Sequence, residues 1–314
     1  MGKALQTEEK NINVQQLIQQ KKQKRNMSQT IEKIIPFLLL ACAAVSVLTT
    51  VGILFTLLRE SITFFTDVNI FDFYTGTKWS PWSNHFGVLP LITGTLLITV
   101  IAILVAVPLG LMSAIFLSEY ASDRVRRIVK PTLEVLAGIP TVVYGYFALT
   151  FVTPVLQNFF DLVIFNALSA GIVVGIMIIP MIASLSEDAM NAVPNSLREG
   201  ALAMGATRFE VAVKVVLPAA FSGIVASIVL AISRAIGETM IVTIAAGASP
   251  ALTFDPTRSI ETLTAFIVQG ATGDTTFGST IYYSIYAVGV TLFVFTLGMN
   301  LLSQWVSRKF KEDY

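Results

Sequence analysis

Long charge-free runs of apolar residues alternate with polar segments along the chain after its first 33 residues. A helix needs about 20 apolar residues to cross a membrane, because each residue advances it by about 1.5 Å and the hydrocarbon core is about 30 Å thick. Six runs approach or exceed that length, at residues 34–58, 86–118, 135–160, 162–186, from 215 onward and 275–307. The pattern therefore predicts an all-α membrane protein with six transmembrane helices.

The composition of the 314 residues supports a membrane location. Hydrophobic residues make up 54% of the chain, charged residues 13%, and the mean hydropathy is +0.73, whereas a soluble domain carries about 25% charge. The apolar content excludes intrinsic disorder, and the single Cys42 excludes a disulfide-stapled secreted scaffold. The sequence offers no ligand set for a metal or cofactor, and a net charge of +1 gives no field that attracts nucleic acid.

Positively charged residues gather in alternate loops, and this bias sets the orientation of the chain. With the N-terminus in the cytoplasm, 17 of the 21 Lys and Arg residues lie on the inner side. Only Arg59, Lys78 and Arg258 lie outside, and Arg234 lies within a span. We therefore expect both termini in the cytoplasm.

The same pattern divides the chain into segments. Residues 1–33 are polar and typical of a mobile cytoplasmic tail, and 34–58 form a retained transmembrane helix, because a signal peptide has an apolar region of only about 7 to 15 residues. An external loop over 59–85 precedes the other five spans at 86–306. Residues 307–314 form a cytoplasmic C-terminus.

A cytoplasmic loop at 187–217 carries the signals of a short helix. Ser196 and Glu199 have the spacing of a capping box, in which each residue satisfies a free backbone amide of the first turn. The helix that starts there is expected to end at Gly205, because glycine tolerates the left-handed conformation found at helix ends.

A second helix follows this glycine directly. Thr207 and Glu210 repeat the capping-box spacing and open a segment that ends before Pro218. The two helices form a rigid corner on the cytoplasmic side. Such a corner can transmit displacement to a soluble partner, or its helices can lie on the lipid headgroups.

A longer pattern of fixed spacing runs through the same loop. Its members are Glu199, Gly200, Ala201, Gly205, Val215, Leu217 and Pro218, and Ala206 is a small residue directly after Gly205. The pattern resembles the EAA loop of type I permeases of bacterial ABC importers, with Gly200 in place of the central Ala and Val215 in place of an Ile. In that family the loop docks into a groove of an ATPase, so the resemblance implies a coupling helix at about 196–212.

A narrower resemblance covers nearly the whole chain and rests on five segments, at 75–81, 86–91, 136–145, 184–190 and 233–240. These are similar to the phosphate-importer permease family PstC, whose members carry one extra helix before a MetI-like core. The resemblance implies a bacterial cytoplasmic-membrane protein that imports phosphate. The implied partners are a second permease of the PstA type, an ATPase dimer of the PstB type and an extracytoplasmic phosphate-binding protein of the PstS type.

Two charged residues, Arg234 and Glu238, lie within the apolar fifth span. Each costs about 2.5 to 3.5 kcal/mol at a helix centre and so needs a partner or an aqueous cavity. Four residues apart, they share a helix face and can pair with each other. With the resemblance, we favour a substrate path in which Arg234 attracts the anion and Glu238 prevents the anion from being bound too tightly. Thr239 adds a hydroxyl donor to this path, although such hydroxyls often bond to their own backbone.

The sequence contains no G-x-x-x-x-G-K-[ST] motif, so it holds no nucleotide in a P-loop and we expect no enzyme activity. Uphill import therefore needs a separate ATPase. A permease for sulfate or molybdate is the main alternative, because arginine does not distinguish these oxyanions. An ion-coupled secondary transporter is a further alternative, but it needs no rigid cytoplasmic corner and has inverted repeats that this sequence does not show.

Overall fold

The protein is described here by a computed structural model that covers the backbone of residues 2–273 and 275–309, with side chains at 34–273 and 275–305. The chain forms two compact units, Met1–Thr56 and Leu57–Tyr314. The first unit is a single helix, the N-terminal part of α1 (Gly2–Asp67). Because α1 begins at Gly2, the backbone of the expected N-terminal tail is helical. Its apolar part from Ile34 onward is long enough to cross a membrane.

The described residues contain four uninterrupted helices that are long and apolar enough to span a membrane, and two bent helix pairs that bring the number to six. Besides α1, the uninterrupted spans are α3 (Leu89–Ile115) with the π-helical turn η2 (Phe116–Tyr120), α7 (Ala167–Asn191) and α14 (Thr280–Lys309). The six predicted spans and the all-α class are thus confirmed.

The third and fifth predicted spans correspond to the bent pairs, whose first helices begin within segments predicted to be cytoplasmic loops. The third consists of α4 (Asp123–Ala137), α5 (Thr141–Phe147), η3 (Ala148–Val152) and α6 (Thr153–Gln157), with a bend of 86°. The fifth consists of α9 (Arg208–Val211), η4 (Ala212–Val216), α10 (Leu217–Ala219) and α11 (Phe221–Ile236), with a bend of 72°. Pro140 accounts for the first bend, because the residue before a proline is disfavoured in a helix.

The centre of the second unit is the packing of α3 against α7. Small residues allow the two backbones to approach closely: a Cβ atom on Gly175 would lie 2.9 Å from the carbonyl oxygen of Ala102. A further contact joins α7 to α11 through a hydrogen bond of 2.8 Å between Ser186 and Ser227. Close approach of this kind is the usual way in which membrane helices associate, since lipid provides no hydrophobic driving force between them.

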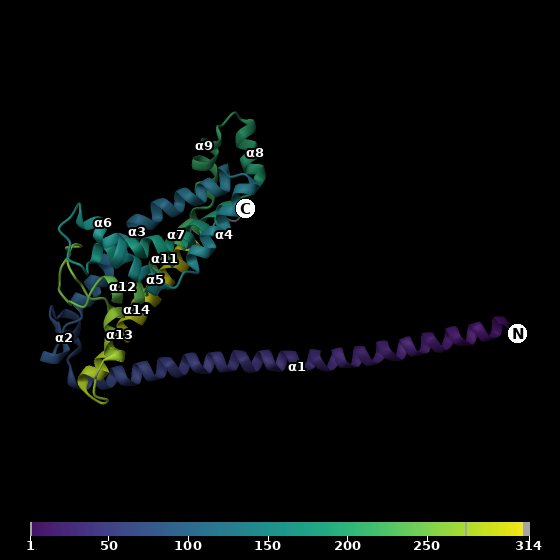
Figure 1. Cartoon of the computed structure of the whole chain (residues 1–314), viewed down its shortest axis with the longest axis horizontal. Coiled ribbons are helices and arrows are strands. Elements are labelled where there is room, and N and C mark those ends of the chain that lie inside the picture. The colour runs from purple at the N-terminus through teal and green to yellow at the C-terminus, as the bar shows by residue number, and fades with distance from the viewer. Residues whose placement is uncertain (1, 274, 310–314) are drawn as a thin grey trace. The chain divides into compact units, whose positions relative to one another are not determined.

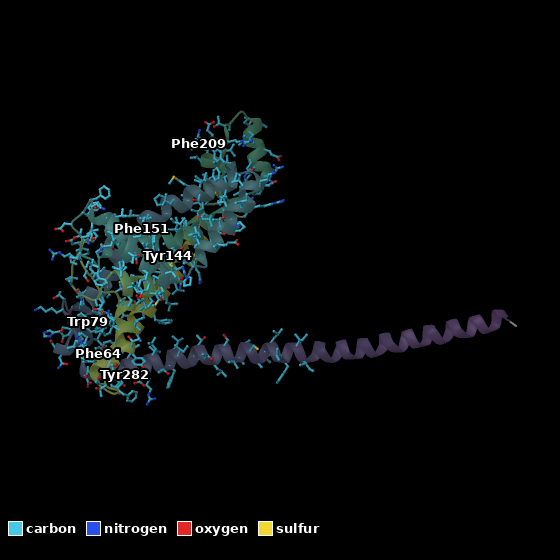
Figure 2. The ribbon with its side chains drawn as sticks, in the orientation of Figure 1. Phe64, Trp79, Tyr144, Phe151, Phe209 and Tyr282 are labelled. Atoms are coloured by element: carbon cyan, nitrogen blue, oxygen red, sulfur yellow. The ribbon has the colours of Figure 1, made fainter. Side chains whose placement is uncertain are left out.

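One end of the second unit carries six short elements, the first four of them in or beside the segment predicted to be an external loop. They are α2 (Ile70–Thr75), the antiparallel hairpin of β1 (Trp79–Ser80), η1 (Pro81–Ser83) and β2 (His85–Phe86), and the short helices α12 (Met240–Ala245) and α13 (Leu263–Thr272). The opposite end carries α8 (Asn195–Ala203) and α9 (Figure 1). Figure 2 likewise places Phe209 at the α8 end and Trp79 at the other.

Candidate translocation and coupling site

The corner between α8 and α9 has the geometry that its glycine predicts. Gly205 adopts a φ of +88°, a left-handed conformation that disfavours residues with a Cβ atom, although open space surrounds the position. The second capping box is confirmed: the Thr207 amide donates to Glu210 Oε2 at 3.0 Å, and the Glu210 amide donates to Thr207 Oγ1 at 3.3 Å. The hydrogen bond from the Thr207 backbone is the main reason that the pKa of Glu210 falls to about 2.

The first predicted capping box is wrong. The helix α8 begins at Asn195, one residue earlier than expected, and its N-cap residue Pro194 makes no side-chain cap bond. Ser196 therefore lies inside the first turn, where its hydroxyl is not in the N-cap position. The rigid corner thus depends on the glycine and on the second capping box.

The predicted coupling residues divide into two groups by burial. Glu199, Gly200, Gly205 and Pro218 are exposed. Ala201, Ala206 and Leu217 are half-buried and pack against a small hydrophobic cluster that includes Val211 and Val216. The first group can therefore contact a partner, whereas the second fixes the corner onto the spans.

Exposed apolar side chains that the family pattern does not contain also mark the corner. Met204 is 89% exposed, and Phe209 and Leu202 are exposed beside it. Large apolar side chains exposed together outside the spans are typical of a protein interface. The signal in the sequence was their position between two polar capping signals, on a loop predicted to lie in water.

Arg198 connects α8 to two other elements. Its guanidinium donates to the backbone oxygens of Met190 at 2.6 Å and Val193 at 2.7 Å, and it forms an ion pair of 3.2 Å with Glu119 of η2. A cation thereby contacts carbonyl oxygens at the C-terminal end of α7 and just beyond it, where the helix dipole favours positive charge. The sequence counted Arg198 only as an inner-side charge and gave Glu119 no role.

A second set of charges lies on the same side, between α4 and α7. Glu187 is fully buried and forms ion pairs with Arg126 and, at 3.2 Å, with Lys130, which also pairs with Asp188 at 3.0 Å. A buried carboxylate is tolerated when cations surround it. Two of the four cations of α4, which the sequence analysis placed in a cytoplasmic loop, thus hold this helix against α7.

The predicted path residues lie at an interruption of the fifth span. The helix α11 ends at Ile236, so Arg234 is in its last turn and Glu238 lies beyond it, in the link to α12. The expectation that Arg234 and Glu238 share the face of one helix is therefore wrong. Gly237 ends the helix between them, and no ion pair joins these two residues among the described side chains.

Glu238 and Thr239 are held by local bonds. Glu238 is buried, and its carboxylate accepts a hydrogen bond of 3.4 Å from the amide of Ile241, in the first turn of α12. Its backbone oxygen accepts from Thr264 of α13 at 2.7 Å. The Thr239 hydroxyl donates to the Gly237 oxygen at 3.2 Å, which is a bond to nearby backbone. Arg234, by contrast, is exposed and has no hydrogen bond or ion pair within the described part of the chain.

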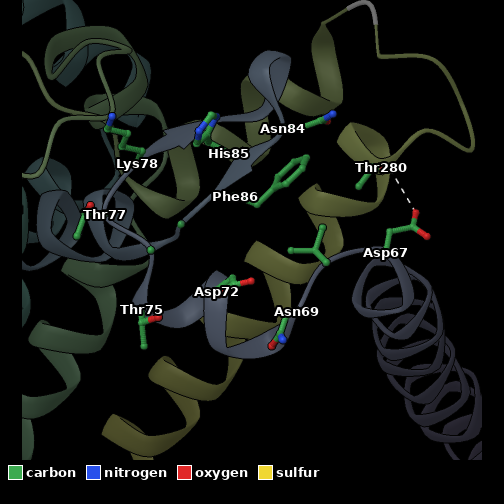
Figure 3. Close-up of a pocket in the computed structure, with 13 residues that line it drawn as sticks. Asp67, Asn69, Asp72, Thr75, Thr77, Lys78, Asn84, His85, Phe86 and Thr280 are labelled. Carbon is green, nitrogen blue, oxygen red and sulfur yellow. Dashed lines mark hydrogen bonds between the residues drawn. The ribbon is translucent and has the colours of Figure 1, made fainter.

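The hairpin of β1 and β2 borders a polar cavity of about 610 Å³ (Figure 3). Asp67, Asp72, Lys78 and His85 line it, and Asp67 accepts a hydrogen bond of 3.3 Å from Thr280. The two carboxylates make it a poor site for gathering an anion. No group of three or more potential metal ligands occurs within the described residues.

Comparisons with known proteins give relatives of this chain among transport permeases. A family model described as "Binding-protein-dependent transport system inner membrane component" matches residues 106–312. The probable ABC transporter permease protein YqgH of Bacillus subtilis is 36% identical over 276 residues, which are 86% of this chain and 89% of that protein. The phosphate transport system permease protein PstC of Mesorhizobium japonicum is 36% identical over 260 residues, covering 75% and 78%.

Two solved structures share the fold at low sequence identity. A chain of the bacterial alginate ABC transporter, in complex with a pentasaccharide-bound periplasmic protein, is 18% identical with a TM-score of 0.64 and covers 88% of this chain and 96% of its own. A chain of the inward-facing MetNI methionine ABC transporter is 18% identical with a TM-score of 0.56, covering 75% of this chain and 100% of its own.

Proposed function

Because the chain belongs to the family of binding-protein-dependent transport system inner membrane components, we propose that it is the permease subunit of an ATP-driven importer of inorganic phosphate. The observation that carries the proposal is Arg234, a cation that lies exposed where the fifth span is interrupted. The same chain carries the rigid corner of α8 and α9, which can contact an ATPase. Relatives named as phosphate transport permeases support the choice of phosphate.

Arg234 is the residue that we assign to the substrate path. A guanidinium within a span does not face hydrocarbon without a cost of several kcal/mol, and Arg234 is exposed on its own chain. Its exposed face must therefore meet water or a second polypeptide in the membrane. Both conditions hold for an aqueous path between two permease subunits. A planar guanidinium, which is charged at every physiological pH, suits an oxyanion that carries between one and two negative charges.

Glu238 limits how tightly that path holds its substrate. The residue lies four positions after Arg234 and is buried against the start of α12. A carboxylate near the cation makes a local anion minimum shallower, and a site that binds too strongly cannot conduct. The hydroxyl of Thr239 donates to the backbone oxygen of Gly237. In this proposal Thr239 therefore stabilises the interruption of the fifth span.

The corner of α8 and α9 is the surface that we assign to the ATPase. Its exposed Glu199, Met204 and Phe209 give it a mixed polar and apolar face. Closure of an ATPase dimer displaces this face, and the contacts of Arg198 pass the displacement to α7 and η2. The proposed partners are an ATPase dimer of the PstB type, a second permease of the PstA type and an external binding protein of the PstS type.

Phosphate uptake by cells that contain the complete transporter tests this proposal. Replacing Arg234 by Gln is expected to abolish uptake at normal membrane levels of the protein. Arg258→Gln is the matched control, since Arg258 is exposed in an external loop and pairs with Asp255, and it should keep uptake near the wild-type rate. Normal uptake by Arg234→Gln, or uptake of labelled phosphate that excess sulfate suppresses, would contradict the proposal.

A further inference from the structure

A second cavity, of about 360 Å³, opens between the external hairpin and α13. Its walls include the aromatic rings of Trp79, Trp82 and Phe266, and Glu261 contributes a carboxylate. No Lys, Arg or His is among its lining residues. The cavity is thus an aromatic pocket that contains one acidic group.

Glu261 has no partner in the part of the chain that the structure describes. The residue is 4% exposed, yet its carboxylate makes no hydrogen bond or ion pair there. The neighbouring hydroxyls are engaged elsewhere, since Thr262 bonds to Thr264, and Thr264 donates to Glu238. Burial raises the pKa of Glu261 to about 7, as expected for a carboxylate that lost water without gaining a cation.

A second polar group of the pocket is also unsatisfied. Trp79 is 3% exposed, and its indole Nε1 has no hydrogen-bond partner within residues 34–273 and 275–305. Its ring is fixed edge-on against Phe266 with the ring centres 4.7 Å apart, so the N–H cannot turn freely toward another acceptor. Buried polar groups in native proteins are nearly always paired. Of the two groups, the Glu261 carboxylate is the one that can receive a ligand in the cavity.

A basic side chain has the chemistry that this pocket lacks. A carboxylate forms its strongest hydrogen bonds with an ammonium or guanidinium group. Aromatic rings attract the same cations through their faces.

The pocket lies at the external end, where apolar and acidic groups are exposed together. Trp82, Phe254 and Phe277 are each more than three-quarters exposed, on segments outside the candidate spans. The adjacent cavity carries Asp67 and Asp72. Exposed aromatic residues with a desolvated charge among them are the features of a protein interface, and the excess of carboxylates selects a basic partner.

We propose that the pocket formed by Trp79, Phe266 and Glu261 receives a lysine or arginine side chain of the extracytoplasmic binding protein. The identity of this partner rests on the proposed function. The basic side chain anchors the binding protein over the outer end of the path, and Glu261 is the group that recognises it.

The test is the affinity of the binding protein for the complete transporter in lipid nanodiscs. Glu261→Gln keeps the shape of the side chain and removes its charge, so the dissociation constant should rise at least tenfold, mainly through faster dissociation. The same change should leave the thermal stability equal or higher, because it removes an unpaired buried charge. A merely structural residue would show the opposite, with lower stability and unchanged affinity. Asp255→Asn is the matched control, since this external carboxylate is already bonded to Thr257 and Arg258, and its affinity should stay within twofold.

Two results overturn the inference. One is an unchanged dissociation constant for Glu261→Gln while the wild-type transporter binds normally; this result leaves the proposed function intact. The other is a Glu261→Gln variant that separates from the second permease subunit, because the basic group would then come from that subunit. A wild-type transporter that neither binds the external protein nor imports phosphate refutes the proposed function itself.

Discussion

Replacing Arg198 by Gln should uncouple ATP hydrolysis from phosphate transport. Arg198 is the residue whose bonds attach the coupling helix α8 to the end of α7 and to η2. A glutamine at this position is too short to reach all three acceptors, and it carries no charge for Glu119. The corner would then move without moving the spans.

The magnitude follows from the burial of the pair. The Arg198 and Glu119 side chains are only 15% and 9% exposed, so solvent screens their interaction weakly. Removing one partner of a buried ion pair costs about 3 to 5 kcal/mol, largely because the other charge is left unpaired. Each 1.4 kcal/mol is a factor of ten. The ratio of docked to undocked α8 should therefore fall by a factor of roughly 100 or more.

The assay measures ATP hydrolysis and phosphate uptake in the same proteoliposomes that contain the complete transporter. For Arg198→Gln we expect continued hydrolysis and at least a tenfold lower number of phosphate ions imported per ATP. Arg198→Lys should lie between this variant and the wild type, because a lysine keeps the charge but not the planar fork that bonds two carbonyls. Arg258→Gln is the matched control, since Arg258 is an exposed cation that pairs with Asp255, away from the corner of α8 and α9, and it should leave the ratio unchanged. A wild-type ratio in Arg198→Gln would refute the reasoning.

Three further predictions concern local geometry. Gly205→Ala should destabilise the corner by about 1 to 2 kcal/mol because of the left-handed backbone. Gly200→Ala, in a helix with open space around it, should instead stabilise α8 by about 0.5 to 1 kcal/mol. Hydrogen exchange of the loop amides should show opposite changes in protection for the two variants. The capping carboxylate of Glu210 has a folded-state pKa lowered from 4.5 to about 2. Its contribution to the stability of the corner is therefore complete above pH 4.5 and is lost as the pH falls toward 2. Hydrogen exchange measured over this pH range should show a loss of protection in the wild type that Glu210→Gln lacks. Gly94→Ala would place a Cβ atom on the backbone oxygen of Glu261, so thermal unfolding of the purified complex should show a loss of about 1 to 3 kcal/mol, and an unchanged midpoint would contradict this close contact.

Local signals in the sequence predicted several features of the fold correctly. Apolar run length gave the six spans, because a membrane imposes a fixed minimum length on a helix. The left-handed Gly205 and the capping box of Thr207 and Glu210 also follow from residues that interact with their own neighbours. The EAA pattern located the corner for the same reason, since its spacing is a local property of one loop.

Features that depend on distant partners could not be read in this way. The first capping box failed because α8 starts at Asn195, where Arg198 is bonded to the end of α7. The helix α13 was missed because its 10 residues are too few for a span, and its position depends on contacts with α3 and the link after α11. The interruption at Gly237 was also missed, because the apolar run continues past it.

The sequence by itself determined that this protein is a helical membrane protein with a rigid corner at Gly205, since span length and capping are written in consecutive residues. Only the tertiary structure decided which charges meet. It paired Arg198 with Glu119 and surrounded Glu187 with Arg126 and Lys130. It left Arg234 exposed, and it buried Glu261 without a partner among the described side chains. The energy of a charge depends on its burial and on the groups within a few ångströms of it, and the folded chain alone brings those groups together.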